Sequence, residues 1–242
     1  MNTTARVALV TGAGQRVGRA IAESLAQHGW RVAVHYRDSE AGALEVVEFI
    51  RAQGGDAQAF KADLRDAVAC DALVDAAYDH FGALNLLVNS AAGMEKTRLG
   101  HVRAPEFDAI IALNLRAPFF LAQAAARLMP AGSAIVNIAD HMALEPWPDY
   151  SVHGIAKAGV IALTRHLAAA LAPDIRVNAV APGFVLAPPG FPSDAVDAFA
   201  KDTPLQRIGT PSDVADAVRF LADAGFVTGQ TLFVDGGRSV RP

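Results

Sequence analysis

Short apolar runs alternate with longer amphipathic stretches along the whole chain. The short runs are continuously apolar, which is typical of strands buried on both faces of a sheet. Expected strands cover residues 7–10, 31–35, 57–61, 84–89, 134–138, 176–181 and 231–234. Expected helices cover residues 19–28, 40–53, 67–81, 107–128, 152–172 and 211–223. This alternation predicts an α/β fold in which a doubly wound parallel sheet is covered by helices on both faces.

No repeat, linker or change of composition divides the chain, so residues 1–242 are predicted to form a single domain. The longest irregular stretch runs from residue 182 to residue 204 and is rich in Pro and Gly. Loops of this length in compact domains are commonly lids or binding loops. Ligands of doubly wound sheets bind beyond the C-terminal ends of the strands. We therefore expect residues 182–204 to form a lid over a substrate site, with a merely variable surface loop as the alternative.

The composition narrows the class of protein. With 52% hydrophobic and 19% charged residues, the chain can bury a large core, which argues against disorder. The net charge of −4 and the lack of a long basic run argue against nucleic-acid binding. Residues 1–10 lack the features of a signal peptide, and no run approaches 18 apolar residues, so no membrane association is predicted. The single cysteine, Cys70, excludes an internal disulfide and fits a cytoplasmic location.

A glycine-rich segment, residues 11–18 (TGAGQRVG), lies between the first expected strand and the first expected helix. Glycines let the backbone turn tightly and approach a pyrophosphate, whose charge a helix N-terminus favours. The glycine spacing differs from the common G-x-G-x-x-G, but the strand–turn–helix setting supports the same function. We expect Gly12, Gly14, Arg16, Val17 and Gly18 to bind the phosphates of a dinucleotide.

The end of the second expected strand indicates which dinucleotide is used. An acidic residue there would bind a ribose 2′-hydroxyl and select NAD. The sequence instead places Tyr36 and Arg37 at this end, and Arg16 lies in the glycine segment. Guanidinium groups match a 2′-phosphate, so we predict NADP(H). Asp38 stands one residue too late, and a shift of one residue would reverse this preference.

A second candidate site surrounds Lys157, near the start of an apolar helical run. His153 lies four residues before Lys157 and Tyr150 lies seven residues before it. All three can share one helix face, because residues at i, i+4 and i+7 lie together at about 3.6 residues per turn. Together with the phosphate site, these side chains indicate a nicotinamide-dependent reductase.

With these residues in place, the chain resembles the short-chain dehydrogenase/reductase superfamily over nearly its whole length. Further matches are Asp63-Leu64 (adenine contact), Asn89-Ser90-Ala91 (after the fourth strand), Asn114 (support of a catalytic water), Arg176-Val177-Asn178, the turn with Pro182, Gly183 and Val185 (facing the nicotinamide) and Val234-Asp235-Gly236-Gly237. The resemblance implies a Rossmann-type fold, use of NAD(P)(H), a small-molecule substrate and a homodimer or homotetramer. It also implies that the Lys157 ammonium binds the nicotinamide ribose hydroxyls.

The departures from the family pattern concern the chemistry. His153 stands where most members have a proton-donating tyrosine, and Asp140 stands where they have a serine. Arg16 and Asp140 together are similar to pteridine reductases, which reduce C=N bonds with NADPH but retain the tyrosine. Met94 stands where those enzymes carry an aromatic residue that stacks on the pterin. Tyr150, seven residues before Lys157, instead matches the Tyr-x6-Lys spacing of enoyl thioester reductases.

Three side chains are candidates for the proton that must accompany hydride transfer. We rank Tyr150 first, although its pKa must be lowered by a cation such as Lys157. His153 is second, because its ordinary pKa is already near neutral and a carboxylate such as Asp140 would orient it. Asp140 is third, as an acid whose pKa is raised by burial.

The prediction is an NADPH-dependent reductase of a small conjugated C=N, C=C or C=O bond, similar in active-site pattern to pteridine reductases. The alternatives are an enoyl thioester reductase that uses Tyr150, and a non-catalytic NADP(H)-binding sensor or subunit. The histidines show no metal-ligand spacing, so no metal site is predicted. By family analogy, the Phe119-Phe120 pair and the apolar faces of residues 107–128 and 152–172 form a subunit interface.

Overall fold

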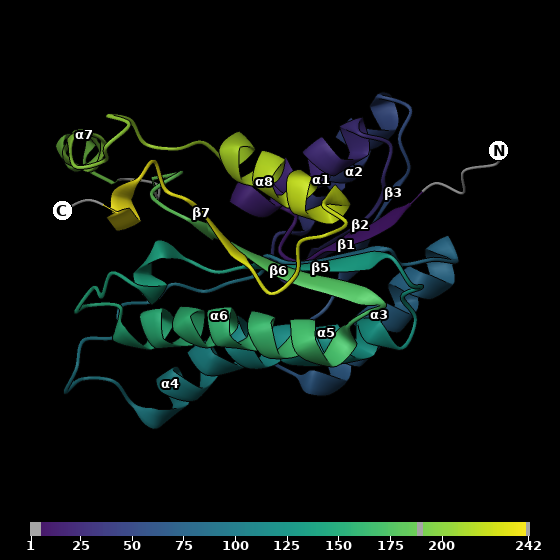
Figure 1. The fold of residues 1–242 in the computed structure, drawn as a ribbon, viewed down its shortest axis with the longest axis horizontal. Helices are drawn as coiled ribbons and strands as arrows, with labels where there is room; N and C mark the ends of the chain where they lie inside the picture. Colours follow the sequence, from purple (N-terminus) through teal and green to yellow (C-terminus); the bar gives the residue numbers. More distant parts are fainter. Residues whose placement is uncertain (1–5, 188–190, 241–242) are drawn as a thin grey trace.

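The computed structural model describes residues 6–187 and 191–240, which form a seven-stranded sheet with helices on both faces (Figure 1). The strands are all parallel and lie in the order β3-β2-β1-β4-β5-β6-β7. They are β1 (Val7–Val10), β2 (Arg31–Tyr36), β3 (Ala57–Lys61), β4 (Leu86–Asn89), β5 (Ser133–Ile138), β6 (Ile175–Pro182) and β7 (Thr231–Val234). The chain starts in the middle of the sheet and builds outward in both directions, so the strand order reverses between β1 and β4. Ligands of such sheets bind at this reversal.

The helices fall into two layers (Figure 1). They are α1 (Arg16–Gln27), α2 (Glu40–Ala52), α3 (Ala67–Phe81), α4 (Ala104–Ile111), α5 (Ala117–Ala126), α6 (Ser151–Leu171), α7 (Ser193–Lys201) and α8 (Pro211–Asp223). Helices α1, α2 and α8 cover one face, and α3, α5 and α6 cover the other. Strand β1 shows why both faces are apolar: Ala8 and Val10 point into the first core, whereas Val7 and Leu9 point into the second. The predicted doubly wound Rossmann-type fold is thereby confirmed.

The helix expected at residues 107–128 is interrupted in the structure. Helix α4 ends at Ile111, a π-helical segment η1 (Ala112–Arg116) follows, and α5 then continues the same helical path. Segments of this kind often occur at functional sites, and η1 carries Asn114. The hydrophobic period over these residues does not reveal the extra residue in the turn.

Two other boundaries differ from the expectation. Helix α1 begins at Arg16, three residues earlier than predicted, so the end of the glycine segment is already helical. The stretch at 182–204 is not wholly irregular, because α7 occupies its second half. Residues 188–190 of the predicted lid lie outside the described residues.

Two helical stretches are long and apolar enough to cross a membrane by length and composition, namely Ala104–Ala126 and Ser151–Leu171. The sequence-based expectation rested on a different criterion, a continuous run of about 18 apolar residues, and neither stretch contains such a run. These stretches are rich in Ala and contain only short polar interruptions, so their mean hydropathy is high although no continuous apolar run is long. Core helices of soluble proteins pass the same test, and both stretches pack against the rest of the fold (Figure 1).

Candidate active site

The glycine segment is packed tightly against the residues that follow β4. Gly12 has a φ of +65°, and a Cβ atom on it would lie 2.9 Å from the Ala91 Cα. A Cβ on Gly18 would lie 2.3 Å from the Gly12 carbonyl oxygen. The Thr11 hydroxyl accepts hydrogen bonds from the backbone N–H groups of Ser90 (2.9 Å) and Ala91 (3.0 Å). Predicted phosphate-binding residues and the predicted element after β4 therefore lie side by side.

His35, which the sequence pattern did not single out, supports the glycine segment from β2. Its Nδ1 accepts the Gly12 backbone N–H at 3.0 Å, and its Nε2 lies 3.2 Å from the Ala62 carbonyl oxygen. This arrangement requires the neutral tautomer with the proton on Nε2. Burial lowers the pKa of His35 from 6.5 to about 4, so the ring is neutral at pH 7. The only feature of the sequence that could have indicated this role is the presence of a histidine inside an otherwise apolar strand.

Arg16 has a left-handed backbone conformation of the kind that glycine adopts most easily. Its φ is +54°, which costs an L-residue about 1–2 kcal/mol. Its guanidinium donates a 2.9 Å hydrogen bond to the carbonyl of Leu186, on the segment after β6. Arg16 therefore joins the glycine segment to the predicted lid, a contact that the sequence did not reveal. The neighbouring Val17 packs against the core from the first turn of α1.

The second part of the glycine segment contacts the start of α2. A Cβ on Gly14 would lie 2.6 Å from the Ser39 hydroxyl oxygen. A Cβ on Gly42 would lie 2.3 Å from the Gly14 carbonyl oxygen. Gly42 therefore has a structural role in this loop that the sequence pattern missed, because glycine inside a helix gives no signal of a close approach.

The residues expected at the adenosine end lie where β2 and β3 end. Arg37 is exposed and forms an ion pair with Asp38, while the Tyr36 hydroxyl donates to Glu40. Asp63 forms an ion pair with Arg65, and hydrogen bonds from Arg65 lower the pKa of Asp63 to about 2. Leu64, the residue after Asp63, is buried. This end of the site therefore offers exposed guanidinium groups and ionised carboxylates.

Lys157 projects from α6 and is almost completely buried. Its Nζ donates a 2.7 Å hydrogen bond to the Ile138 carbonyl at the end of β5. Burial lowers the pKa of Lys157 to about 8, although the negative charge of Asp140 opposes this shift. The lysine is therefore mainly charged at pH 7 and is held at the C-terminal edge of the sheet.

Asp140 lies between two buried histidines. Its Oδ1 is 3.1 Å from Nδ1 of His141, and its Oδ2 is 3.5 Å from Nε2 of His153. Burial raises the pKa of Asp140, but its interactions with the nearby rings of His141 and His153 outweigh this effect and hold the pKa well below its usual range. Asp140 is therefore a carboxylate at neutral pH. This argues against the third predicted proton donor, which required a raised pKa.

Asn114 and His153 meet at one carbonyl group. The Gly93 oxygen lies 3.1 Å from Asn114 Nδ2 and 3.0 Å from His153 Nδ1. Within the described chain, Asn114 Oδ1 and His153 Nε2 are buried and have no hydrogen-bond partner. The structure thus joins η1, the segment after β4, the start of α6 and the end of β5 through Asn114, Gly93, His153 and Asp140.

Tyr150 precedes the helix that carries His153 and Lys157. It is the N-cap of α6 and has φ −131° and ψ 32°, so periodicity within the helix does not fix its direction. The periodicity argument for one shared helix face therefore covers His153 and Lys157 but not Tyr150, because the helix begins at Ser151. The Tyr150 ring instead packs against Trp147, with 6.1 Å between ring centroids.

The turn after β6 closes the other side of the site. The Pro182 carbonyl lies 3.3 Å from His141 Nδ1, and Gly183 is packed so closely that its Cβ would lie 2.8 Å from the Asp235 Cα. Val185 is buried. At the end of β4, next to the reversal of the strand order, Asn89 donates to Asn137 and keeps a buried, unpartnered Oδ1 within the described chain. Met94 is nearly half exposed.

These residues fit a dinucleotide cofactor with its reacting end beside Lys157. The glycine segment leaves no room for side chains, and the buried polar atoms of Asn89, Asn114 and His153 without partners lie around the C-terminal edge of the sheet. The described residues contain no group of three or more His, Cys, Asp or Glu that could hold a metal ion. Fold and site together define a nucleotide-dependent oxidoreductase of the Rossmann type.

Comparisons with known proteins place the chain more closely. A family model described as "Enoyl-(Acyl carrier protein) reductase" matches residues 12–239. A 3-oxoacyl-[acyl-carrier-protein] reductase from Synechocystis sp. is 38% identical, covering 97% of each chain. The chain belongs to the short-chain dehydrogenase/reductase superfamily, as the sequence motifs predicted, and is an oxidoreductase of that group.

Solved structures agree with this placement. A dehydrogenase/reductase from Sinorhizobium meliloti 1021 is 36% identical with a TM-score of 0.92, covering 96% of this chain and 94% of its own. A blue fluorescent protein from a metagenomic library, solved in complex with NADPH, is 32% identical with a TM-score of 0.92. That similarity covers 98% of this chain and 99% of the other.

Proposed function

We propose that the protein is an NADPH-dependent reductase that delivers hydride to a small conjugated C=N, C=C or C=O bond, with His153 as the proton donor. The observation that carries the choice of His153 is the position of its two ring nitrogens. Nδ1 faces the Gly93 carbonyl, and Nε2 faces the Asp140 carboxylate. Both neighbours are acceptors, so the doubly protonated ring satisfies both contacts and the neutral ring satisfies only one. On this ground the proposal places His153 ahead of Tyr150, which ranked first from the sequence alone.

The cofactor supplies hydride from its nicotinamide, and the protein supplies the matching proton. His153 Nε2 is 3.5 Å from Asp140, close enough for charge stabilisation but long for a hydrogen bond, so its proton can pass to a substrate. Gly93 holds the other nitrogen and keeps the ring in place. Lys157 binds the ribose hydroxyls of the nicotinamide, and Asn114 anchors the Gly93 carbonyl.

The preference for NADP(H) rests on the positive charge at the end of β2. Arg37 is an exposed guanidinium at the position where an acidic residue would select NAD. A similar structure holds NADPH. The predicted residues Gly12, Gly14, Arg16, Val17, Gly18, Asp63, Leu64, Asn89, Ala91, Pro182, Gly183 and Val185 form the remaining cofactor site under this proposal.

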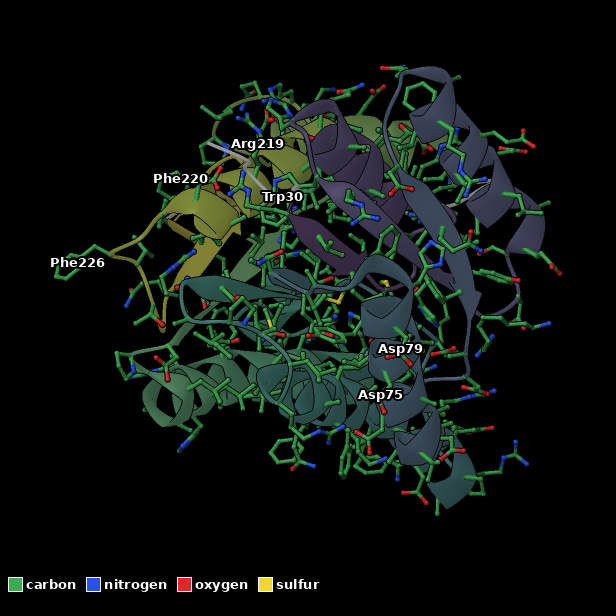
Figure 2. All side chains as sticks on the ribbon, turned by 90° about the vertical axis from the view of Figure 1, so that its right-hand side faces the viewer. Trp30, Asp75, Asp79, Arg219, Phe220 and Phe226 are labelled. Atoms are coloured by element: carbon green, nitrogen blue, oxygen red, sulfur yellow. The ribbon has the colours of Figure 1, made fainter. Side chains whose placement is uncertain are left out.

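A homo-oligomer, in the cytoplasm, is part of the same proposal. Large apolar side chains are exposed on the outer helical layer, including Phe107 on α4, Phe119 on α5 and Ile155 on α6. Exposed large apolar side chains on neighbouring helices are of the kind that subunit contacts bury. Phe226, at the turn before β7, is also exposed and points away from the rest of the molecule (Figure 2).

A thioester reductase that uses Tyr150 is the second candidate. The description of the matching family and the names of several relatives favour acyl thioester substrates. Tyr150 is partly buried beside Trp147, next to the loop that follows Asp140. Under this alternative, the phenol donates the proton and His153 only orients Asp140.

Consumption of NADPH tests the proposal. Purified protein is assayed against dihydropterins, enoyl thioesters, 3-oxoacyl thioesters, quinones and activated ketones. His153→Gln should lower kcat by about 100-fold or more, the usual contribution of a general acid, and should leave the Kd for NADPH unchanged. Tyr150→Phe is the matched control and should keep most of the activity. Loss of turnover only in Tyr150→Phe would favour the thioester alternative, and tight NADPH binding without turnover would favour a non-catalytic sensor.

A further inference from the structure

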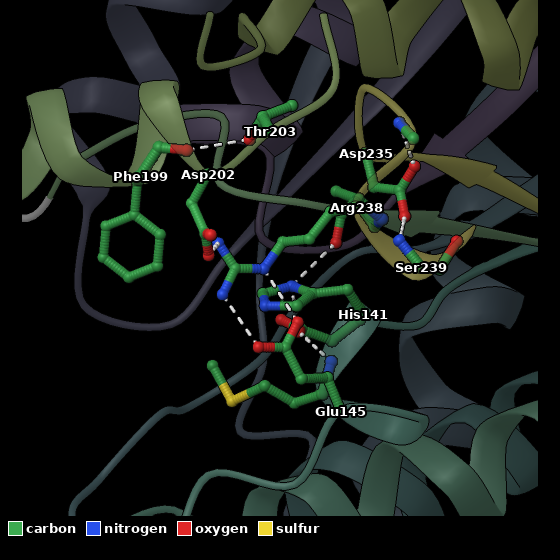
Figure 3. A network of polar contacts seen from close by, with 12 residues as sticks. His141, Glu145, Phe199, Asp202, Thr203, Asp235, Arg238 and Ser239 are labelled. Carbon is green, nitrogen blue, oxygen red and sulfur yellow. Dashed lines mark hydrogen bonds and ion pairs between the residues drawn. The ribbon is translucent and has the colours of Figure 1, made fainter. Parts of the chain in front are cut away.

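Arg238, in the short turn η3 (Arg238–Val240) after β7, is buried although it is a charged residue near the C-terminus. Its Nε and Nη2 donate to the two carboxylate oxygens of Glu145, each at 2.7 Å (Figure 3). Its Nη1 lies 3.6 Å from Asp202, directly after α7. The guanidinium carbon also lies 5.0 Å from the centre of the Phe199 ring.

Phe199 connects this cation to an aromatic stack. Its ring lies parallel to Phe184, with 4.5 Å between centroids and 5° between planes. It also stacks on Trp147, with 5.5 Å between centroids and 24° between planes. Trp147 in turn meets His141 edge-on at 5.5 Å. The turn after β6, helix α7 and the loop after β5 therefore meet around Arg238.

Glu145 belongs to the same turn as Asp140. Its backbone N–H donates to the His141 carbonyl at 3.0 Å, and the Asp140 carboxylate accepts the Met142 N–H at 2.8 Å. A side chain that fixes Glu145 therefore also fixes the backbone that presents Asp140 to His153. Bidentate pairing makes this restraint directional as well as strong.

We propose that Arg238 is a positioning residue that latches helix α7 to the 140–150 loop and thereby sets the geometry of the substrate site. It acts on the loop through Glu145, and on α7 through Phe199 and Asp202. The inference rests on the proposed reductase function, since the site that it shapes is the one around Asp140 and His153. The latch lies at the substrate side and does not touch the glycine segment, so substrate affinity should change without a change in cofactor affinity.

The test uses Trp147 as a reporter of the latch. The chain has two tryptophans, so Trp30→Phe leaves Trp147 as the only one. In that background, Arg238→Gln and Glu145→Gln should each make Trp147 more accessible to acrylamide quenching. They should raise KM by about tenfold or more, as expected for breaking a buried charge pair, and leave the Kd for NADPH unchanged. Arg238→Lys should fall between these variants and the parent.

Two further variants separate positioning from general stability. Arg207→Gln removes a two-contact pair with Asp213 that is exposed to solvent, and it should leave quenching and KM as in the parent. Glu145→Arg or Arg238→Glu alone should increase the quenching of Trp147 and raise KM. The double variant, in which the two charges are exchanged, should return part of the way to the parent values. The proposal is overturned if Arg238→Gln and Glu145→Gln behave like Arg207→Gln in quenching. Absence of turnover in the parent would count against the proposed function. The acrylamide quenching of Trp147 would still show whether Arg238 and Glu145 hold the loop and helix α7 together.

Discussion

The neutral imidazole of His35 should make the stability of this protein depend on pH below neutrality. Burial lowers the pKa of His35 from 6.5 to about 4. An unfolded chain therefore binds a proton at this residue between about pH 6.5 and pH 4, whereas the folded chain does not. The stabilisation is complete above the unfolded pKa and is lost as the pH falls toward 4. The difference in pKa corresponds to about 3 kcal/mol of unfolding free energy.

Urea unfolding of wild type and His35→Asn at several pH values from 7.5 to 4.0 measures this effect. Asparagine does not titrate, and its amide oxygen can accept the Gly12 N–H as Nδ1 does. Carboxylates with lowered pKa, such as Asp63 and Asp213, also contribute pH dependence, but equally in both proteins. Wild type should therefore lose about 3 kcal/mol more than the variant between pH 7.5 and 4. Parallel pH profiles would refute the reasoning.

Three other predictions concern the cofactor site. Gly42→Ala should destabilise the protein by about 1–3 kcal/mol, because its Cβ would meet the Gly14 carbonyl at 2.3 Å. Gly225→Ala, where no atom lies within 4 Å, is the control, and equal urea midpoints would contradict the argument. Arg16→Gly should relieve about 1 kcal/mol of backbone strain but free the segment around Leu186. The Arg16→Gly variant should therefore have an unchanged or higher melting temperature and faster proteolysis at the segment around Leu186. A lower melting temperature would contradict this prediction. The Kd for NADPH should rise above about pH 8, where Lys157 loses its charge, and a flat profile would exclude this role.

The sheet could be predicted from the sequence because buried parallel strands are continuously apolar. Val7–Val10 and Ser133–Ile138 are buried at every position, so the pattern contains no competing period. The glycine segment was also predictable, since glycines between a strand and a helix are typical of a turn that binds phosphate. Both inferences depend only on neighbours within about ten residues along the chain.

Contacts between distant segments could not be predicted in the same way. Glu145 and Arg238 are 93 positions apart, and both are charged residue types that usually lie on the protein surface. Their partnership follows from the packing of four segments around Phe199. The orientation of Tyr150 could not be predicted for a different reason. Helical spacing gives the direction of a side chain only inside a helix, and Tyr150 is the N-cap residue before α6.

The burial of His153 bears on whether it is a functional residue or one that merely fills the place of a lost tyrosine. A buried imidazole without partners costs free energy, so a passive replacement would be expected to turn toward solvent or to lie among apolar groups. Here the ring is 2% exposed and lies between the Gly93 carbonyl and the Asp140 carboxylate. Asp140 itself is ionised because two histidines offset its burial. The two departures from the family pattern therefore lie in direct contact, and under the proposed function they act as one unit. Under that proposal, the unit supplies the proton beside Lys157 without requiring a tyrosine.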